Sequence, residues 1–359
     1  MERVLVTGAA GYIGTTLVPM LLEQGYAVRA VDRLFFGDDV LAPHPQLEVV
    51  KTDARLLEPA HLDGVDMVID LVAISNDPSG ELFQDATYQI NEQARVRCAR
   101  LARDAGVQRY VLPSSCSIYG FQEPGVICTE TQPTNPLTTY AKANERAEHG
   151  VLALSSDEFC VVVLRQATVY GYSPRMRFDL AINGMTYGAW RNGVLPLMRD
   201  GSQWRPMVHV RDAAMAQIFM LTAPVERVNG EIFNVGSDAN NYQLGPLAEE
   251  VADSMTVRPA IEWYGDADHR SYRVAFDKIE SLGWKAELTA GDGAREISAK
   301  LEDGTLEQTD RTITLSWYKD LVRWHRIIKD VELGGGIFDI EGLEKLLGDE
   351  VPATERPTP

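Results

Sequence analysis

The sequence has no long apolar run, and this absence excludes one class of protein at the outset. A membrane-spanning helix needs about 20 consecutive apolar residues, and no segment of the 359 residues approaches that length. The chain also passes from Met1 directly into an apolar strand and a glycine-rich turn, which is unlike a secretory signal peptide. We therefore expect a cytoplasmic protein that does not associate with membranes.

Cysteine and positive charge are also scarce. The four cysteines, Cys98, Cys116, Cys128 and Cys160, are widely spaced and form no CxxC pair, so the sequence predicts reduced thiols and neither a disulfide framework nor a metal site. Lysine and arginine number 34 against 52 aspartates and glutamates, which gives a formal net charge of −18. Such a charge opposes binding to nucleic acid, although a local basic pocket can still hold a phosphorylated small molecule.

What the chain does contain is a regular alternation of strand and helix patterns. Apolar β-rich runs recur through the first half with helical patterns between them: RVLVTG, AVRAVD, LEVVKTD, MVIDLVA, RYVLPSS and CVVVLRQ. This alternation predicts a parallel sheet with helices on both faces, and the nearly continuous apolar character fits strands that are covered on both sides. We predict an α/β fold: a Rossmann-type doubly wound parallel sheet with a smaller α/β substrate-binding lobe towards the C-terminus.

A glycine-rich turn follows the first predicted strand. The segment VLVTGAAGYIGTTL places Gly8, Gly11 and Gly14 between that strand and an amphipathic helix. Glycine allows a tight turn and a close approach of the backbone to a pyrophosphate, to which the helix N-terminus offers free N–H groups. A glycine turn before any helix is the simpler interpretation, but the flanking strand and helix favour a dinucleotide site.

Acidic residues after the next two strands refine the choice of cofactor. Asp32 ends the second strand, where its carboxylate can accept hydrogen bonds from the adenosine ribose, and it would repel a 2′-phosphate. This favours NAD over NADP, although Arg33 directly after it can accommodate the extra phosphate. Asp53 follows the third strand and either reaches the adenine or is simply a loop residue.

Further motifs follow in order along the chain. They are TGAAGYIG, LVAISNDPSG, SSCSIYG, TTYAKAN, LRQATVYGYSPR, WRPMVHVRDAA and FNVGSD, from residue 3 to about residue 300. With these motifs the chain resembles the extended short-chain dehydrogenase/reductase family, the NAD-dependent nucleotide-sugar epimerases and dehydratases. The resemblance implies a tightly held NAD, a nucleotide-diphosphate sugar in the second lobe, a homodimer formed through the helices near 86–105 and 140–154, and chemistry that begins with transient oxidation of a sugar carbon.

The resemblance also implies which residues form the site. Ser115 falls on the hydroxyl that binds the sugar oxygen, and Tyr140 on the general base; the plainer interpretation of Ser115 is a hydroxyl that ties down a strand end. The predicted cofactor-binding residues are Gly8, Gly11, Tyr12, Ile13, Gly14, Asp32, Arg33, Asp53, Ala54, Leu71, Val72, Ala73, Asn91, Tyr140 and Asn144. The predicted substrate-binding residues are Ser75, Asn183, Arg205 and Arg270, with Arg273 as a competitor for the role of Arg270.

The chain departs from the family pattern four residues after the tyrosine. The family has a lysine there, on the same helix face as the tyrosine, whereas this sequence has Asn144. Lys142 lies only two residues after Tyr140 and therefore on a different face. An amide can still bind the nicotinamide ribose but carries no positive charge to favour the tyrosinate, so either catalysis continues with a less acidic tyrosine or the scaffold serves another purpose.

The residues after Ser115 bear on the reaction. Family dehydratases have an acidic pair there, and this chain has Cys116 and Ser117, so no carboxylates are available for a 4,6-elimination. Cys116 is either an acid or base in its own right or a small wall residue. We predict a 4-epimerase, with two alternatives: an NAD(P)-dependent nucleotide-sugar reductase or dehydratase, and a non-catalytic NAD(H)-binding module in which Asn144 marks decay. The sequence does not specify the nucleotide or the sugar.

We expect four segments along the chain. Residues 1–171 form the NAD-binding Rossmann domain, to which segments near 206–236 return, and residues 172–310 form most of the substrate-binding lobe. Residues 311–349 are predicted to be a helical extension. The proline-rich segment 350–359 is predicted to be disordered.

Overall fold

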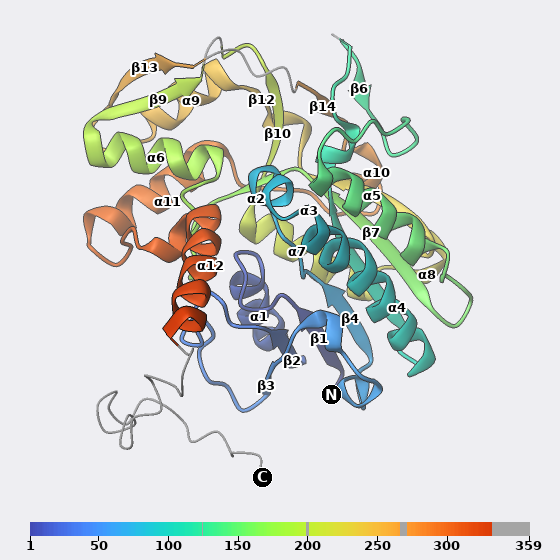
Figure 1. Ribbon diagram of the computed structural model, residues 1–359. Coiled ribbons are helices and arrows are strands. Elements are labelled where there is room, and N and C mark those ends of the chain that lie inside the picture. The colour runs from blue at the N-terminus through green and yellow to red at the C-terminus, as the bar shows by residue number, and fades with distance from the viewer. Residues whose placement is uncertain (124, 199–200, 266–270, 332–359) are drawn as a thin grey trace. The chain divides into compact units, whose positions relative to one another are not determined.

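The computed structural model describes residues 1–123, 125–198, 201–265 and 271–331. The chain divides into two compact units, Met1–Ile313 and Thr314–Pro359. The first unit is built around a seven-stranded sheet (Figure 1). Its strands are β1 (Arg3–Thr7), β2 (Ala27–Asp32), β3 (Leu47–Lys51), β4 (Met67–Asp70), β5 (Arg109–Ser115), β7 (Cys160–Gln166) and β11 (Glu231–Val235).

The strand order of this sheet identifies where a ligand binds. The order is β11-β7-β5-β4-β1-β2-β3, and every neighbouring pair is parallel. The chain begins in the middle with β1, moves outward to β3, and then returns to β4 and continues in the other direction. Open α/β sheets bind ligands beyond the carboxyl ends of the strands at such a reversal, here between β1 and β4. The predicted fold class is confirmed.

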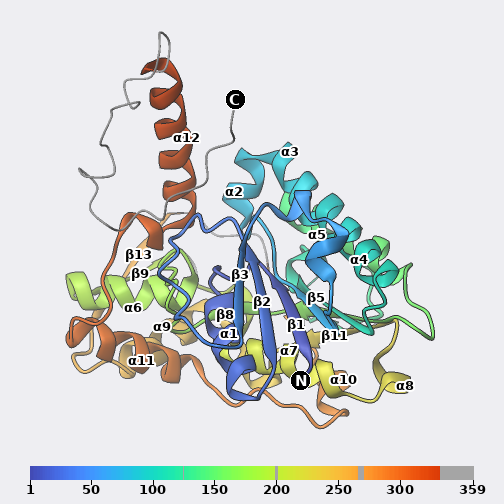
Figure 2. The same cartoon turned by 90° about the horizontal axis from the view of Figure 1, so that it is seen from below.

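Helices cover both faces of the sheet, as the apolar strands require (Figures 1 and 2). On one face, Val4 and Val6 pack into a core with Leu17 of α1 (Gly14–Glu23) and with residues of α7 (Val210–Thr222). Leu5, which points the other way, packs with Ala99 of α4 (Arg95–Asp104) and with residues of α5 (Thr139–Leu152). The alternation of side chains along β1 thus builds two separate cores.

The helix expected near 86–105 differs from the prediction in one detail. It consists of α3 (Gln84–Thr87), the π-helical segment η3 (Tyr88–Ala94) and α4. A π-helical turn widens the helix and shifts which residues face inward on its two sides, and such turns are frequent at functional sites. The residue that directly follows this turn, Arg95, is 1% exposed.

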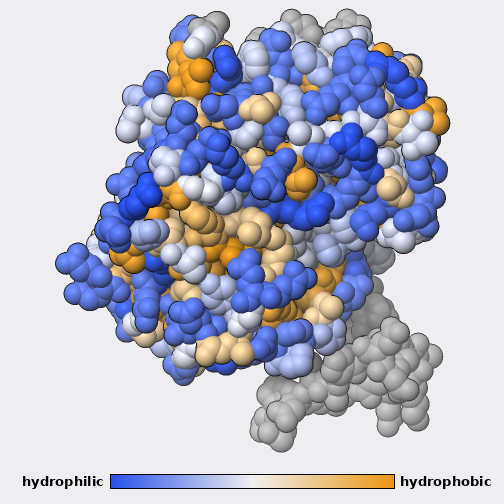
Figure 3. Space-filling view, turned by 180° about the vertical axis from the view of Figure 1, so that it is seen from behind, coloured by the Kyte–Doolittle hydropathy of each residue, from blue (hydrophilic) through white to orange (hydrophobic). Residues whose placement is uncertain are grey.

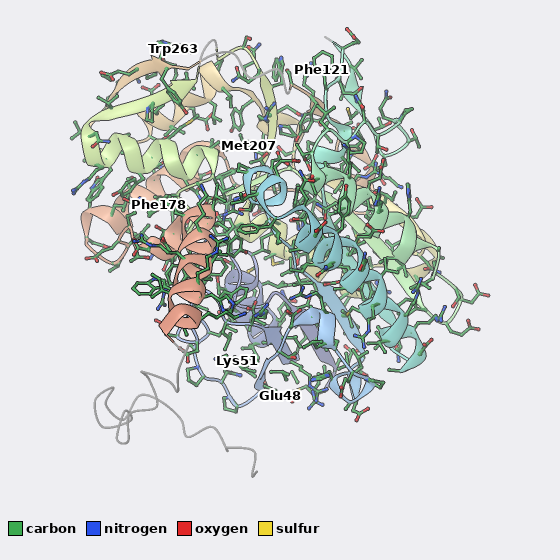
Figure 4. All side chains as sticks on the ribbon, viewed as in Figure 1. Glu48, Lys51, Phe121, Phe178, Met207 and Trp263 are labelled. Carbon is green, nitrogen blue, oxygen red and sulfur yellow. The ribbon has the colours of Figure 1, made fainter. Side chains whose placement is uncertain are left out.

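The elements beyond the carboxyl ends of the sheet strands form smaller sheets. They are β8 (Thr168–Tyr170), β10 (Trp204–His209) and β12 (Asn241–Gln243) in one sheet, β9 (Val194–Met198) with β13 (Ala260–Tyr264), and β6 (Ile127–Cys128) with β14 (Arg273–Val274). In Figure 4, Glu48 and Lys51 of β3 lie at the lower edge of the view, and Met207 and Trp263 of the small sheets lie above them. Since β8 precedes residue 172 and pairs with β10, the two parts interleave, and the domain boundary at 172 stays a prediction.

The remaining helices of the first unit are short or pack on these small sheets. They are α2 (Asp77–Leu82), α6 (Ala181–Asn192), α8 (Val225–Val228), α9 (Leu244–Asp253), α10 (Asp277–Glu280), α11 (Ala290–Glu302), η1 (Ala54–Leu56), η2 (Pro59–Leu62), η4 (Cys116–Tyr119), η5 (Asp238–Asn240) and η6 (Asp310–Thr312). The second unit contains α12 (Thr314–Val331). Residues 332–359, which include the predicted tail 350–359, lie outside the described residues.

The cysteines form no disulfides, as the sequence predicts, and the face shown in Figure 3 is mostly hydrophilic. Figure 3 shows a face on which hydrophilic residues predominate, with hydrophobic atoms in smaller groups between them. All four cysteines are free and buried, as predicted. Among the described residues, no helix combines the length and the apolar content that a membrane crossing requires.

Candidate active site

The turn between β1 and α1 is shaped by three glycines. Gly8 has φ +64°, and a Cβ at this position would lie 2.9 Å from the backbone of Leu71 and Val72. A Cβ at Gly14 would lie 2.4 Å from the carbonyl oxygen of Ala9. Neither position tolerates a side chain, because real Cβ atoms do not approach other atoms so closely. The turn therefore packs tightly against the loop after β4, at the reversal point of the sheet.

The same turn presents unused hydrogen-bond donors. Among the described residues, the backbone N–H groups of Tyr12 and Ile13, just before α1, donate to no protein acceptor. The side chain of Tyr12 is buried and donates to the carbonyl oxygen of Gly171 at 2.6 Å, which fixes the loop to the segment after β8. Free N–H groups at a helix N-terminus and a backbone without side chains suit a pyrophosphate, so these residues fit the dinucleotide that the sequence predicted.

Asp32 is held at the adenosine end of this site by two backbone groups. Its carboxylate accepts from Ala10 N at 3.0 Å and from Leu34 N at 2.8 Å. Leu34 has φ 59°, the left-handed conformation, and is the one non-glycine residue with positive φ among those described. Burial raises the pKa of Asp32, and the two N–H groups act in the opposite direction. Each carboxylate oxygen has a second lone pair, so Asp32 can also accept from a ribose hydroxyl.

Arg33 and Asp53 are paired with each other. Arg33 Nη1 donates to Asp53 Oδ2 at 3.0 Å, and its guanidinium stacks on Phe35 at 4.2 Å. Asp53 also accepts from the Arg55 side chain at 2.7 Å, and these arginines lower the pKa of Asp53. Because Arg33 already has a carboxylate partner, it is less available for a 2′-phosphate. The contact between Asp53 and adenine stays a prediction.

We expect the protein to bind NAD more tightly than NADP, and Asp32→Asn to weaken that preference about tenfold to hundredfold. The change removes the charge that repels a 2′-phosphate and weakens the acceptor for the ribose, and a hydrogen bond to a charged group contributes about 1.5–3 kcal/mol. Fluorescence titration with each dinucleotide measures the two affinities. The matched control is Arg33→Ala, which should leave the preference nearly unchanged; a collapse of the preference in that variant contradicts the assignment to Asp32.

The loop after β4 is positioned by a buried asparagine. Asn91 in η3 accepts from Ile74 N at 2.8 Å and donates to Ile74 O at 3.0 Å. These two bonds place Leu71, Val72 and Ala73 beside the glycine turn. The predicted contact between Asn91 and the cofactor is therefore at most indirect, because the side-chain oxygen and nitrogen of its amide both bond to the loop. Ala54, at the start of η1, is also buried.

Ser115 and Tyr140 meet beyond the carboxyl end of β5. Ser115 is the last residue of β5, and its Oγ accepts from Ser117 N at 3.1 Å. Tyr140 is the second residue of α5, and its phenol lies near the Ser115 hydroxyl. Burial raises the pKa of Tyr140, whereas the Ser115 side chain acts to lower it. Ser114, one residue earlier on the strand, points to the other side, where it donates to Glu148.

Cys116 and Ser117, the two residues after Ser115, differ in their burial and in their hydrogen bonds. Cys116 is 1% exposed, packs in the hydrophobic core and donates to the carbonyl oxygen of Arg165 at 3.1 Å. Burial raises the pKa of its thiol well above the usual value. These observations favour the wall residue that the sequence also allowed, and a catalytic role of Cys116 stays a prediction. Ser117 is partly buried, and its hydroxyl has no hydrogen-bond partner among the described residues.

Asn144, in the place of the family's lysine, is 1% exposed. Its Nδ2 donates to the carbonyl oxygen of Tyr140 at 3.1 Å, and its Oδ1 accepts from Nη1 of Arg95 at 3.0 Å. Lys142 is exposed and on another face, as predicted. The sequence analysis missed Arg95, although Arg95, Cys98, Ala99 and Ala102 share an apolar helix face at i, i+3, i+4 and i+7, which could have identified it.

The predicted substrate-binding residues fall into separate groups. Ser75 Oγ accepts from Nη1 of Arg177 at 3.0 Å, and Arg177 also pairs with Asp179 at 2.6 Å. Arg177 and Asp179 were missed by the sequence analysis, because an arginine in a loop carries no periodic signal. They place a charged pair beside Ser75, in which Arg177 is buried.

Asn183, which was predicted to bind substrate, lies inside the protein. It is fully buried in α6, where its amide donates to Tyr12 OH at 3.0 Å and to Arg177 O at 2.9 Å and accepts from Gly171 N at 2.9 Å. These bonds connect α6 to the turn before α1. A contact between Asn183 and a substrate stays a prediction.

Of the arginines considered for the diphosphate, Arg205 lies on β10 and Arg273 is the first residue of β14. Arg205 lies over the ring of Tyr272 at 5.6 Å, and Arg273 over the ring of Trp204 at 4.7 Å. Tyr272 N donates to Trp204 O at 3.4 Å, which brings the two segments together. Arg270 lies outside the described residues, so of the two competing residues only Arg273 can be placed.

Comparison with known proteins identifies what the chain is similar to. The model of the NAD dependent epimerase/dehydratase family matches residues 4–236. A UDP-glucuronate 4-epimerase of Thermodesulfobacterium geofontis is 24% identical over 82% of this chain and 94% of its own length. A 3 beta-hydroxysteroid dehydrogenase/Delta 5-->4-isomerase of Mycobacterium tuberculosis is 31% identical over 73% of this chain and 74% of its own length. Among solved structures, MoeE5 in complex with UDP-glucuronic acid and NAD is 26% identical, with a TM-score of 0.74 over 84% of this chain and 100% of that chain.

Proposed function

The chain belongs to the NAD-dependent epimerase/dehydratase family, and from this premise we propose that it is a nucleotide-sugar epimerase that acts by transient oxidation at C4 of the sugar. The observation that carries the proposal is the Ser115–Tyr140 pair at the carboxyl end of β5. β5, which ends at Ser115, and β1, which leads into the glycine turn, are strands of the same sheet, and Ser115 and the turn both lie at the carboxyl ends of these strands, where a ligand binds.

The reaction needs a base for the alcohol proton and an acceptor for the hydride. NAD, when bound, supplies the hydride acceptor, which takes hydride from the sugar carbon and returns it. The chain supplies the base: Tyr140 takes the proton of the C4 hydroxyl, and Ser115 donates to the same oxygen and fixes its position. When the tyrosine returns the proton after the sugar has turned over, the product is the C4 epimer.

The residues around Ser115 favour epimerisation over dehydration. A 4,6-elimination needs a base for the C5 proton and an acid for the leaving hydroxyl. The side chains that follow Ser115 are the buried thiol of Cys116 and the hydroxyl of Ser117, and neither is a carboxylate.

Arginine side chains support a diphosphate-linked substrate. The guanidinium groups of Arg205 and Arg273 lie on adjacent segments, and arginine matches the geometry of phosphate. MoeE5, which is similar in structure, was solved with UDP-glucuronic acid and NAD. We extend this to a nucleotide-diphosphate sugar for the present chain and also propose a homodimer formed through α4 and α5.

The proposal predicts inversion at C4 without loss of the carbon-bound hydrogen. Incubation with a panel of UDP-, GDP-, CDP- and dTDP-sugars in deuterated water, read by NMR, should give the C4 epimer of one nucleotide sugar with its C4 hydrogen retained. Deuterium at C5 or loss of the C6 hydroxyl would instead indicate a dehydratase. No conversion of any sugar, with NAD bound, would support the non-catalytic binding module.

The second candidate is a one-way oxidoreductase, which the similarity to a steroid dehydrogenase keeps open. An epimerase uses the same hydride twice and has no need to release NAD, whereas an oxidoreductase must exchange NAD(H) in every turnover. Protein purified with about one NAD per chain favours the epimerase. An empty cofactor site, together with turnover that requires added NAD(H), favours the oxidoreductase.

A further inference from the structure

The amide of Asn144 connects the base to a buried cation on the neighbouring helix. Its Nδ2 donates to the carbonyl oxygen of Tyr140 at 3.1 Å, and its Oδ1 accepts from Nη1 of Arg95 at 3.0 Å. Asn144 and Arg95 are each 1% exposed. The orientation of the amide is therefore fixed, because its oxygen faces a donor and its nitrogen faces an acceptor.

Arg95 is placed beneath the ends of two sheet strands. Its Nη2 donates to the carbonyl oxygens of Asp70, the last residue of β4, and of Pro113, two residues before Ser115. Its Nε lies 3.7 Å from the Asp70 carboxylate, which itself accepts from Thr7 and Tyr110. A buried guanidinium is costly unless it is paired and hydrogen-bonded. The bonds of its two terminal nitrogens hold Arg95 in one position, whereas its Nε has no hydrogen-bond partner among the described residues.

We propose that Arg95 and Asn144 together replace the lysine of the family motif, with Arg95 supplying the fixed positive charge and Asn144 linking that charge to the helix turn that carries Tyr140. Arg95 is thus a positioning residue that acts on the base through Asn144 and through its charge. The inference rests on the proposed function, because it assigns the role of base to Tyr140. The inference also explains why an asparagine at position 144 is compatible with catalysis, because the positive charge comes from Arg95 on the neighbouring helix α4.

The charges around Tyr140 agree with this arrangement. Burial is the largest cause and raises the pKa of Tyr140, and the carboxylate of Asp77 on α2 acts in the same direction, whereas Ser115, Arg95 and Asn144 act to lower it. The other charged groups on or against α5 are engaged elsewhere or exposed: Glu81 accepts from Thr139 N at 2.6 Å, Glu148 pairs with Arg165 at 2.8 Å, Arg146 pairs with Glu92 at 3.5 Å, Glu145 accepts from Thr134, and Lys142 is exposed. Among the described residues, Arg95 is the buried cation that faces Tyr140 through Asn144.

Asn144→Asp tests the charge without removing Arg95. The aspartate has nearly the same shape and keeps a partner for Arg95, but it adds a negative charge next to Tyr140. The pKa of Tyr140, followed by NMR of protein labelled with ¹³C at the tyrosine Cζ and assigned with Tyr140→Phe, should rise by about one unit, and the acid limb of the kcat/KM profile should move with it. Lys142→Gln, which removes an exposed cation on the same helix, is the matched control and should change neither.

The charge swap gives a second, independent test. Asn144→Lys alone sets an ammonium against the guanidinium of Arg95 and should lower turnover at least about tenfold, whereas Arg95→Gln/Asn144→Lys moves the single cation to α5 and should restore most of it. The NMR titration needs no substrate, so it separates this inference from the proposed function. An unchanged Tyr140 pKa in Asn144→Asp overturns the inference whatever the turnover. The inference is also overturned if the double variant Arg95→Gln/Asn144→Lys is as inactive as Asn144→Lys alone or does not fold.

Discussion

Replacing Tyr140 with phenylalanine should lower turnover about 10²–10⁴-fold, the range over which a general base contributes to catalysis, while NAD binding is retained. The phenol lies near the Ser115 hydroxyl at the end of β5, and phenylalanine keeps the ring but removes the proton acceptor. Asn144 Nδ2 donates to the backbone carbonyl oxygen of residue 140, a bond that phenylalanine keeps, so α5 should keep its position. Turnover of the nucleotide sugar and the NAD content of the purified protein are the measurements.

The control for this variant is Tyr88→Phe. Tyr88 lies in η3, packed against the same helix, and its ring is stacked by Arg146 at 4.8 Å, a contact that phenylalanine preserves. The control should keep turnover within about twofold of the parent protein. If Tyr140→Phe also stays within a few-fold, Tyr140 is not the base, and the proposed mechanism fails even if the substrate is correct.

Gly14→Ala should abolish detectable NAD binding, with a loss of affinity of about 100-fold or more, since misplacing a binding group by about 1 Å is enough for a loss of that size. The added Cβ would lie 2.4 Å from Ala9 O and 2.6 Å from Gly8 O. Both are backbone atoms of the phosphate turn and cannot move aside as a flexible side chain does. The turn must therefore open, which displaces the N–H groups of Tyr12 and Ile13. Fluorescence titration with NAD measures the loss.

Gly245→Ala is the matched control for the glycine turn. Gly245 lies at the start of α9, and a Cβ there would meet the carbonyl oxygen of Gly201 at 3.5 Å, an ordinary contact distance. This variant should bind NAD like the parent protein. Normal NAD affinity in Gly14→Ala would mean that the dinucleotide does not use this turn, and the cofactor assignment would have to be abandoned.

Much of the sheet could be predicted from the sequence because its strands are buried on both sides. Continuous apolar runs such as CVVVLRQ cannot be exposed, and every residue of β7 is indeed buried. The glycine turn was predictable for a similar reason, since the motif specifies backbone conformation and not side-chain contacts. Ser115 and Tyr140 followed from motifs whose spacing places both at the carboxyl side of the sheet.

The contacts that the sequence did not indicate are those that depend on packing. Asn183 has the chemistry of a ligand, but its amide bonds inside the protein to Tyr12, Gly171 and Arg177. Arg95 stands in a helix with Arg97, Arg100 and Arg103, and an arginine in such a sequence is usually solvated. The apolar face that Arg95 shares with Cys98, Ala99 and Ala102 indicates that it turns inward, but its partners Asn144, Asp70 and Pro113 come from distant parts of the chain, and no local pattern indicates them.

The transfer of a labelled hydrogen tests the central claim most directly. A nucleotide sugar deuterated at C4, incubated with the protein in ordinary water, should yield the C4 epimer with all of its deuterium, and the rate should show a primary isotope effect. Both follow if Tyr140 removes the hydroxyl proton while the C4 hydrogen leaves as hydride and returns to the same carbon. Loss of the deuterium to water, or inversion at a carbon other than C4, would contradict the account.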